Sequence, residues 1–294
     1  MRLYINSIIF FMLSCGWSQQ QIVLNSLTDK PIPFVSIYHY GNNIGTYTNE
    51  SGEFKIETLG DSLLLSHLGY KNKVVKNFEK DTIFMQPLRN ELDEIVISQK
   101  IKCKKIGLDK KWSHSSWIAG TKTEYLSLII IDSLYKNYNL EKIHIPIKKT
   151  INSTKNKIDL KNLKAVLRIN IYSVSDNLPD KKVFSSQPIK TKIDSKNNIE
   201  VKIEEPIKLN KNIFIGVEVL GYMDNLGNFS ETKEGFLRLK FTKKTSRYFK
   251  SKSFVKLVFS KQNRIISIDK LRRQHDVDKK NYNLALGLTI CSYE

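Results

Sequence analysis

The chain has 294 residues, of which 40% are hydrophobic and 26% are charged. This composition is too apolar for a fully disordered chain, and only 13 Gly and 7 Pro exclude collagen-like and low-complexity classes. The net charge of +19 lies in the second part of the chain, because residues 101–294 carry 39 Lys and Arg against 19 Asp and Glu. Such asymmetry indicates a second half that faces a polyanion, or simply a solvated surface rich in lysine.

Residues 1–18 have the pattern of a secretory signal peptide. A basic Arg2 precedes a short apolar run at 8–13, and the small residues Gly16 and Ser18 predict cleavage before Gln19. Lipid attachment at Cys15 is the alternative. The apolar run is too short to span a bilayer, and no later segment offers 18 uncharged apolar residues. We therefore expect an exported chain without a transmembrane segment.

Residues 20–98 alternate short apolar runs with turn residues. The expected strands are separated by turns such as Asn49-Glu50-Ser51-Gly52, where Gly52 suits a positive φ. Strands spaced every 8–12 residues favour a β-sandwich or small barrel. The candidate core residues share this alternation: Phe34, Val35, Phe54, Ile56, Leu63, Leu65, Val75 and Phe84.

Four motifs in this region occur in the order of a known family. They are D-K-P-I-P-F-V-S-I at 29–37, G-T-Y-T-N-E-S-G-E-F at 45–54, L-S-H-L-G-Y at 65–70 and L-D-E-I-V-I at 92–97. Together they resemble the carboxypeptidase-D-regulatory-like domain of Bacteroidetes envelope proteins, with Asn49 where that family usually has Asp. The resemblance implies a seven-stranded, transthyretin-like β-sandwich over 19–98 that has no catalytic activity of its own.

The remainder of the chain predicts a linker and a second domain. Residues 99–111 carry six lysines and little apolar content, which indicates a basic linker. Residues 112–294 hold many alternating segments, such as 165–174, 199–203 and 213–219. They predict a second, antiparallel sandwich, and their pattern resembles jelly-roll tails that follow the regulatory-like domain in exported proteins. Periodicity does not decide between strand and helix for 124–135, and 264–280 is expected to be a long loop.

The sequence offers no catalytic or metal-binding motif. None of the five His is followed by Glu three residues later, as a zinc carboxypeptidase would need, and G-x-S-x-G and G-x-G-x-x-G are absent. We therefore expect no catalytic residue, metal or cofactor; an enzyme whose residues converge only in the fold is the rival. Cys103 and Cys291 remain after cleavage, and spacing alone does not show whether they pair.

Two regions supply candidate ligand contacts. Trp112 and Trp117 could stack on sugar rings, or they could seal the start of the second domain. Basic and aromatic residues alternate at 240–256, where Lys243, Lys244, Arg247 and Tyr248 could meet an anion, or form a solvated hairpin.

These observations predict a non-catalytic, exported accessory protein of the periplasm or outer membrane that binds an envelope protein or outer-membrane complex. The alternative is a carbohydrate- or polyanion-binding module in the basic second domain, with polysaccharide or a lipid headgroup as ligand. Export argues against nucleic acid as the partner.

Overall fold

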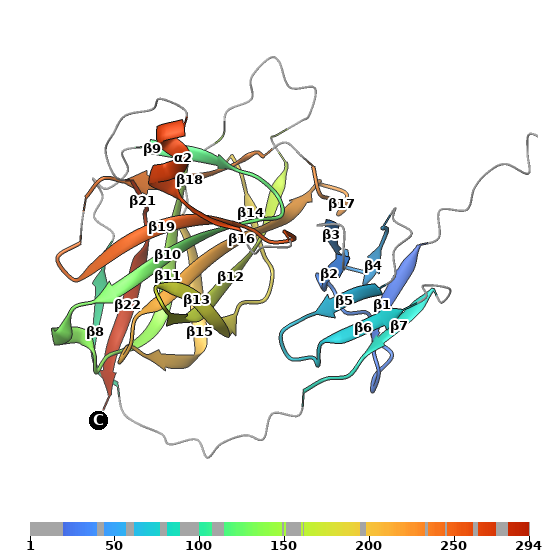
Figure 1. Ribbon diagram of the computed structural model, residues 1–294, viewed down its shortest axis with the longest axis horizontal. Helices are drawn as coiled ribbons and strands as arrows, with labels where there is room; N and C mark the ends of the chain where they lie inside the picture. The colour runs from blue at the N-terminus through green and yellow to red at the C-terminus, as the bar shows by residue number, and fades with distance from the viewer. Residues whose placement is uncertain are drawn as a thin grey trace, which may run out of the picture. The chain divides into compact units, whose positions relative to one another are not determined.

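The computed structural model describes most of the chain, in which β-strand dominates (Figure 1). The chain divides into two compact units, Met1–Arg89 and Asn90–Glu294. The described residues are 20–39, 44–56, 62–76, 81–88, 100–107, 115–148, 150, 160, 162–194, 198–232, 235–244, 246–260, 264–274 and 282–293. The predicted signal peptide and the strand expected at 94–97 lie outside them.

The described residues of the first unit form seven strands in two sheets, as the family resemblance implies. One sheet has the order β4-β1-β7 and the other β3-β2-β5-β6. The strands are β1 Gln21–Asn25, β2 Ser36–His39, β3 Ile44–Tyr47, β4 Glu53–Phe54, β5 Ser62–Ser66, β6 Lys73–Lys76 and β7 Thr82–Met85. Alternate residues of β1, β5 and β7 point into one apolar cluster that includes Val23, Leu63, Leu65 and Met85. The predicted all-β sandwich is confirmed.

One predicted core residue of this unit is wrong. Phe84 is 41% exposed, whereas its neighbours Ile83 and Met85 are buried. Successive side chains of a strand point to opposite faces, so burying Ile83 and Met85 turns Phe84 outward.

The turn at Gly52 is fixed by hydrogen bonds from its neighbours. The Asn49 side-chain oxygen accepts from the backbone N–H of Ser51 and of Glu53, both at 2.9 Å. Gly52 has φ of +75°, and a Cβ there would lie 2.8 Å from the carbonyl oxygen of Val23. Both the backbone conformation and this close approach require glycine.

Substitution of Gly52 by alanine is expected to destabilise the first unit by more than the same change at Gly69. Gly69 also has a positive φ, of +84°, but nothing lies within 4 Å of a Cβ built there. Gly69→Ala therefore measures the cost of the left-handed backbone alone, about 1–2 kcal/mol. Hydrogen exchange of β1 and β4 peptides in the full chain would measure the loss of stability in each variant. Equal losses would show that contact between the added Cβ and the Val23 carbonyl costs no stability.

The second unit is a pair of antiparallel sheets. Its strands are β8 Lys100–Ile106, β9 Ser115–Ala119, β10 Thr123–Ile131, β11 Asn139–Lys148, β12 Lys164–Ser175, β13 Leu178–Ser185, β14 Ile189–Lys192, β15 Asn198–Lys208, β16 Ile213–Met223, β17 Phe229–Ser230, β18 Leu237–Thr242, β19 Phe249–Leu257, β20 Ile265–Ser267, β21 Asn283–Leu284 and β22 Gly287–Tyr293. Its short helices are η1 Ser133–Tyr135 and α2 Ile268–Gln274.

Each sheet of this unit contributes one face to a common core. The eight-stranded sheet has the order β13-β12-β16-β10-β19-β20, with β14 beside β12 and β17 beside β16. The seven-stranded sheet has the order β21-β18-β11-β22-β8, with β15 beside β11 and β9 beside β18. Figure 1 shows β12, β16, β10 and β19 side by side. The largest apolar cluster of the described residues lies between the sheets and includes Ile143, Leu167, Val217 and Phe241.

Three expectations for this unit change. Lys100–Ile106, assigned above to a linker, forms β8, which pairs with β22 from Ile106 to Lys100. Lysines are common on edge strands, which explains why β8 has the composition of a linker. The undecided segment 124–135 is strand β10 followed by η1. Residues 265–274, expected to be loop, form β20 and α2.

The described helices are too short and too polar to cross a membrane.

Candidate functional site

Of the two tryptophans predicted to contact sugar, Trp117 is among the described residues. Trp112 lies outside the described residues. Trp117, on β9, packs against the core with its ring centroid 5.1 Å from that of Phe241. Its half-buried ring serves the packing of the second unit, which was the alternative considered from the sequence.

The predicted basic residues of the second region separate into two groups. The Lys243 ammonium lies 4.8 Å above the ring of Tyr282, and the backbone N–H of Lys244 donates to the hydroxyl of Thr242. Arg247 instead contacts the neighbouring Tyr248: its guanidinium donates to the Tyr248 hydroxyl at 2.6 Å and lies 4.8 Å from the ring centroid.

Arg247 and Tyr248 belong to a larger group, called here the tyrosine–cation cluster: Lys104, Tyr135, Tyr138, Arg247 and Tyr248. The Tyr135 ring stands edge-on to those of Tyr138 and Tyr248, each at a centroid distance of 5.6 Å. The Lys104 ammonium lies 4.6 Å from the Tyr248 ring centroid and donates to the Tyr135 hydroxyl at 3.2 Å. Two cations thus contact one aromatic ring.

Both sheets of the second unit position this cluster. Lys104 is on β8 of the seven-stranded sheet, whereas Tyr135 ends η1, which follows β10 of the eight-stranded sheet. The Asp132 side chain caps η1 by accepting from the Leu134 N–H at 3.0 Å. The Asp132 N–H donates to the Tyr248 carbonyl at 3.2 Å, which holds Tyr248 beside η1. The cluster therefore sits where β10 ends and β19 begins.

The electrostatics of the cluster favour an anion. The hydrogen bond to the Tyr135 hydroxyl raises the pKa of Lys104, while the positive charge of Arg247 acts in the opposite direction. Within the described part of the chain, neither Lys104 nor Arg247 forms an ion pair with a carboxylate. The sequence predicted Arg247 and Tyr248 as candidate contacts but not Lys104, Tyr135 or Tyr138. Lys104 was missed because β8 has the composition of a linker.

A second constellation joins charged groups on the face of the eight-stranded sheet that points away from the sandwich core. The carboxylate of Glu124 on β10 accepts from the Tyr172 hydroxyl and from the Asn170 amide, both at 2.8 Å. The same amide donates to Glu218 on β16 at 2.9 Å. Lys256 lies 3.6 Å from Glu124, and Arg168 lies 3.7 Å from Glu218.

This charged network is nearly inaccessible. Glu124 and Glu218 are 1% and 3% exposed. A Cβ at Gly216 would overlap the Glu124 carboxylate, so the glycine opens the space into which that carboxylate fits. Burial and then the Glu124 charge raise the pKa of Tyr172, which keeps its hydroxyl a donor. The saturated hydrogen bonds indicate that these groups stabilise the sheet.

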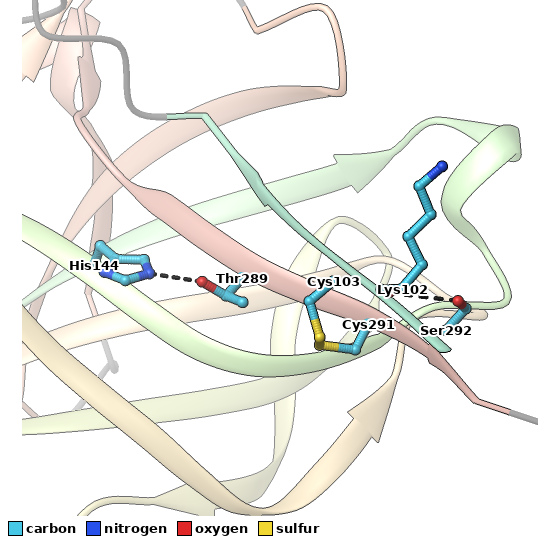
Figure 2. Close-up of a disulfide and its surroundings, with 6 residues drawn as sticks. All are labelled: Lys102, Cys103, His144, Thr289, Cys291 and Ser292. Carbon is cyan, nitrogen blue, oxygen red and sulfur yellow. Dashed lines mark hydrogen bonds between the residues drawn. A yellow bond between two sulfur atoms is a disulfide. The ribbon is translucent and has the colours of Figure 1, made fainter. Parts of the chain in front are cut away.

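A third polar row crosses the outer face of the seven-stranded sheet, and Figure 2 shows two of its members, His144 and Thr289. His144 on β11 faces the Thr289 hydroxyl on β22 through Nε2, at 2.8 Å, and the Glu200 carboxylate on β15 through Nδ1, at 3.3 Å. The row has the order carboxylate, imidazole and hydroxyl that nucleophilic catalysis uses. His144 is only 3% exposed, however, which favours a structural role.

The stability of the second unit is expected to fall in mildly acidic solution because of His144. Burial lowers its pKa, Lys105 and Lys142 lower it further, and Glu200 opposes them. Below the ordinary imidazole value of 6.5, the unfolded chain takes up a proton that the folded chain resists. Stability present above that pH is therefore lost as the pH falls toward the folded pKa. Urea midpoints measured across this range should vary less in His144→Asn than in the unchanged chain; parallel curves would show that other groups are responsible.

Cys103 and Cys291, whose pairing the sequence left open, form a disulfide. They lie directly opposite one another on β8 and β22, and their Cα atoms are 4.1 Å apart (Figure 2). The bridge joins residues separated by 188 positions in sequence. It attaches the edge strand that carries Lys104 to a strand in the interior of the sheet.

In the part of the chain that the structure describes, no group of three or more His, Cys, Asp and Glu side chains is placed to hold a metal ion.

The model of the CarboxypepD_reg-like domain family matches residues 22–97. The match confirms the carboxypeptidase-regulatory-like domain expected there from the four motifs. No curated protein matches the chain. Among solved structures, the chain is similar to the cysteine protease and lectin-like domains of Cwp84, a surface-layer-associated protein of Clostridium difficile, with 12% identity, a TM-score of 0.37, and coverage of 88% of this chain and 58% of that one. A second structure of this clostridial protease, after propeptide cleavage, shows 14% identity, a TM-score of 0.36, and coverage of 88% and 65%. The chain spans less than two thirds of the length of either.

Proposed function

We propose that this chain, an all-β protein in which residues 22–97 form a CarboxypepD_reg-like domain, is an exported, non-catalytic accessory protein of the cell envelope. In this proposal the second sandwich is the interaction module. It contacts an envelope protein or an outer-membrane complex in the periplasm or at the outer membrane.

The observation that carries the proposal is the Cys103–Cys291 disulfide. Structural disulfides persist in oxidising compartments such as the periplasm and are rare in the cytosol. The signal-peptide pattern of residues 1–18 supports the same compartment independently.

The non-catalytic accessory role is supported by the buried carboxylates of the second unit, whose hydrogen bonds and ion pairs are made within the sheet. Glu124 and Glu218 share their oxygens among Tyr172, Asn170, Lys256 and Arg168. Groups held by several partners inside a sheet stabilise it, and they have few lone pairs left for a substrate. The CarboxypepD_reg-like unit is built around an apolar core between its two sheets, as a structural domain would be.

Cell fractionation combined with thiol labelling tests export. The full chain is produced with a C-terminal tag in a Gram-negative host, and thiols are alkylated with a polyethylene-glycol maleimide before and after reduction. We expect the mature chain in envelope fractions, with a gel shift that appears after reduction. A chain found in the cytosol and labelled without reductant would refute export.

Crosslinking in native envelopes, followed by purification on the tag and mass spectrometry, tests the partner. Reproducible enrichment of one envelope protein over a tagged control of similar charge supports the accessory role. A purified chain that hydrolyses envelope polymers would contradict the non-catalytic assignment.

A second candidate function is binding of a carbohydrate or polyanion by the basic second unit. The tyrosine–cation cluster favours it, because Lys104 and Arg247 offer positive charge beside aromatic rings without a carboxylate partner among the described residues. Recovery of polysaccharide without a protein partner in the crosslinking experiment would favour this function over the first.

A further inference from the structure

We propose that the tyrosine–cation cluster is a binding site for a carboxylate-bearing glycan, in which Lys104 and Arg247 bind the acid group and the tyrosine rings contact the sugar. This inference rests on the second candidate function and names its ligand and its residues.

The two cations are held in position before any ligand arrives. Lys104 donates to the Tyr135 hydroxyl at 3.2 Å, and Arg247 donates to the Tyr248 hydroxyl at 2.6 Å. Long basic side chains normally lose rotamer freedom when they bind, and restraint in the free protein lowers that cost. Two restrained cations on one ring suit a ligand whose acid groups have fixed positions.

The remaining hydrogen-bond donors of both cations are suited to a carboxylate. An ammonium has three donors and a guanidinium five, so each retains donors after its bond to tyrosine. Hydrogen bonds from these cations to a carboxylate are charge-assisted and stronger than neutral ones. Both cations lie close to the Tyr248 ring, at 4.6 Å and 4.8 Å from its centroid, and the charge of Arg247 acts on Lys104, so an acidic ligand bound beside this ring is attracted by both.

The tyrosines favour a sugar over a lipid headgroup. Tyr135, Tyr138 and Tyr248 are half-buried, so their rings form a supported surface rather than side chains free to insert into a bilayer. Aromatic faces offer apolar contact to the C–H groups of sugar rings. A membrane surface attracts basic side chains without requiring them to hold fixed positions. Here each cation is instead held in place by a hydrogen bond to a tyrosine hydroxyl.

Isothermal titration of the full mature chain with a short oligogalacturonate tests the site. The methyl ester of the same oligosaccharide keeps the sugar rings and removes the charge. We expect the acid to bind and the ester to bind at least about tenfold more weakly, because charge-assisted hydrogen bonds are lost. Lys104→Met and Arg247→Gln, which keep the aliphatic stems, should each weaken acid binding about tenfold.

Lys105→Met is the matched control, because it removes the same charge from the next residue of β8, which points to the opposite face of the strand. It should leave the affinity unchanged. Tyr135→Phe removes the hydroxyl that positions Lys104 but keeps the ring, and should weaken binding by less than Lys104→Met. A merely structural role for the cluster would alter the urea midpoint of these variants without altering the ratio of acid to ester affinity.

Several results would overturn the site. The site is ruled out if the oligogalacturonate does not bind, or if its methyl ester binds equally well. It is also ruled out if Lys105→Met weakens acid binding as much as Lys104→Met does. Binding of phosphatidylglycerol–phosphatidylcholine vesicles, but not of the oligosaccharide, with the same dependence on the variants would assign the cluster to a lipid surface instead. Heparin fragments separate this site from the broader function. If they bind but Lys104→Met and Arg247→Gln leave their affinity unchanged, polyanion binding stands and the cluster is not its site.

Discussion

Replacing both Cys103 and Cys291 by serine is expected to lower the free energy of unfolding of the second unit by about 4 kcal/mol, near the upper end of the range for disulfides. The reason is the length of the closed loop. The two residues are separated by 188 positions, so the bridge removes many conformations from the unfolded chain.

Urea unfolding of the oxidised chain, the reduced chain and the double serine variant measures this loss. Reduced chain and double variant should unfold at similar, lower urea concentrations than the oxidised chain. An oxidised chain no more stable than the reduced one would contradict the expectation. A reduced chain that is much more stable than the double variant would instead point to packing of the sulfur of Cys291, which is 1% exposed.

The loss should begin at β8. Among the described strands, β8 pairs with β22 alone, at the edge of the seven-stranded sheet. Without the bridge, β8 still has its backbone hydrogen bonds to β22, the Ser292 hydroxyl that donates to the Lys102 carbonyl, and the contacts of Ile106 and Lys104. Hydrogen exchange in β8 should therefore accelerate more than in β11, which lies inside the same sheet. Since Lys104 is on β8, the tyrosine–cation cluster should loosen at the same time.

The sequence is sufficient for elements whose signal is local. Gly52 and Asn49 mark their turn because a positive φ and a side-chain acceptor are needed within four residues. The alternation at 165–174 and 213–219 predicts β12 and β16 because one face of each strand meets the core. β8 has no such local signal, since an edge strand rich in lysine and a solvated linker have the same composition.

The sites are harder to predict because they depend on register between distant strands. Arg247 and Tyr248 are neighbours in sequence, and their basic-aromatic pattern is visible there. Lys104 and Tyr135 are separated by 31 residues, and they meet only because β8 and η1 lie at the same end of the sandwich. Periodicity gives the face to which a side chain points but not the strand that will lie beside it.

The buried charge network around Glu124 also depends on the register between distant strands, and removing it is expected to have a large effect on stability. Glu124 lies opposite Glu218 across β10 and β16, an arrangement of like charges that would be destabilising alone. Asn170 on β12 donates to both carboxylates, while Lys256 and Arg168 each lie near one of them. The register of four strands must be known before these groups are seen to compensate one another.

Glu124→Ala is expected to destabilise the second unit by about 3–5 kcal/mol, because removing one member of a buried charge network leaves its partners uncompensated. The Tyr172 hydroxyl loses its acceptor, and Lys256 loses its nearest carboxylate. Urea unfolding measures the loss, with Glu204→Ala as the matched control, since Glu204 on β15 is exposed and its removal should change stability by less than about 0.5 kcal/mol.

Gly216→Ala provides an independent approach to the same network. Its added methyl group would occupy the space of the Glu124 carboxylate, so the carboxylate must move away from Tyr172 and Asn170. If the network stabilises the sheet, combining Gly216→Ala with Glu124→Ala should cost less than the sum of the two single changes, because the alanine at position 124 no longer needs that space. Additive losses would show that Gly216 is required for another reason, and a small loss in Glu124→Ala alone would show that the carboxylate is not needed for stability.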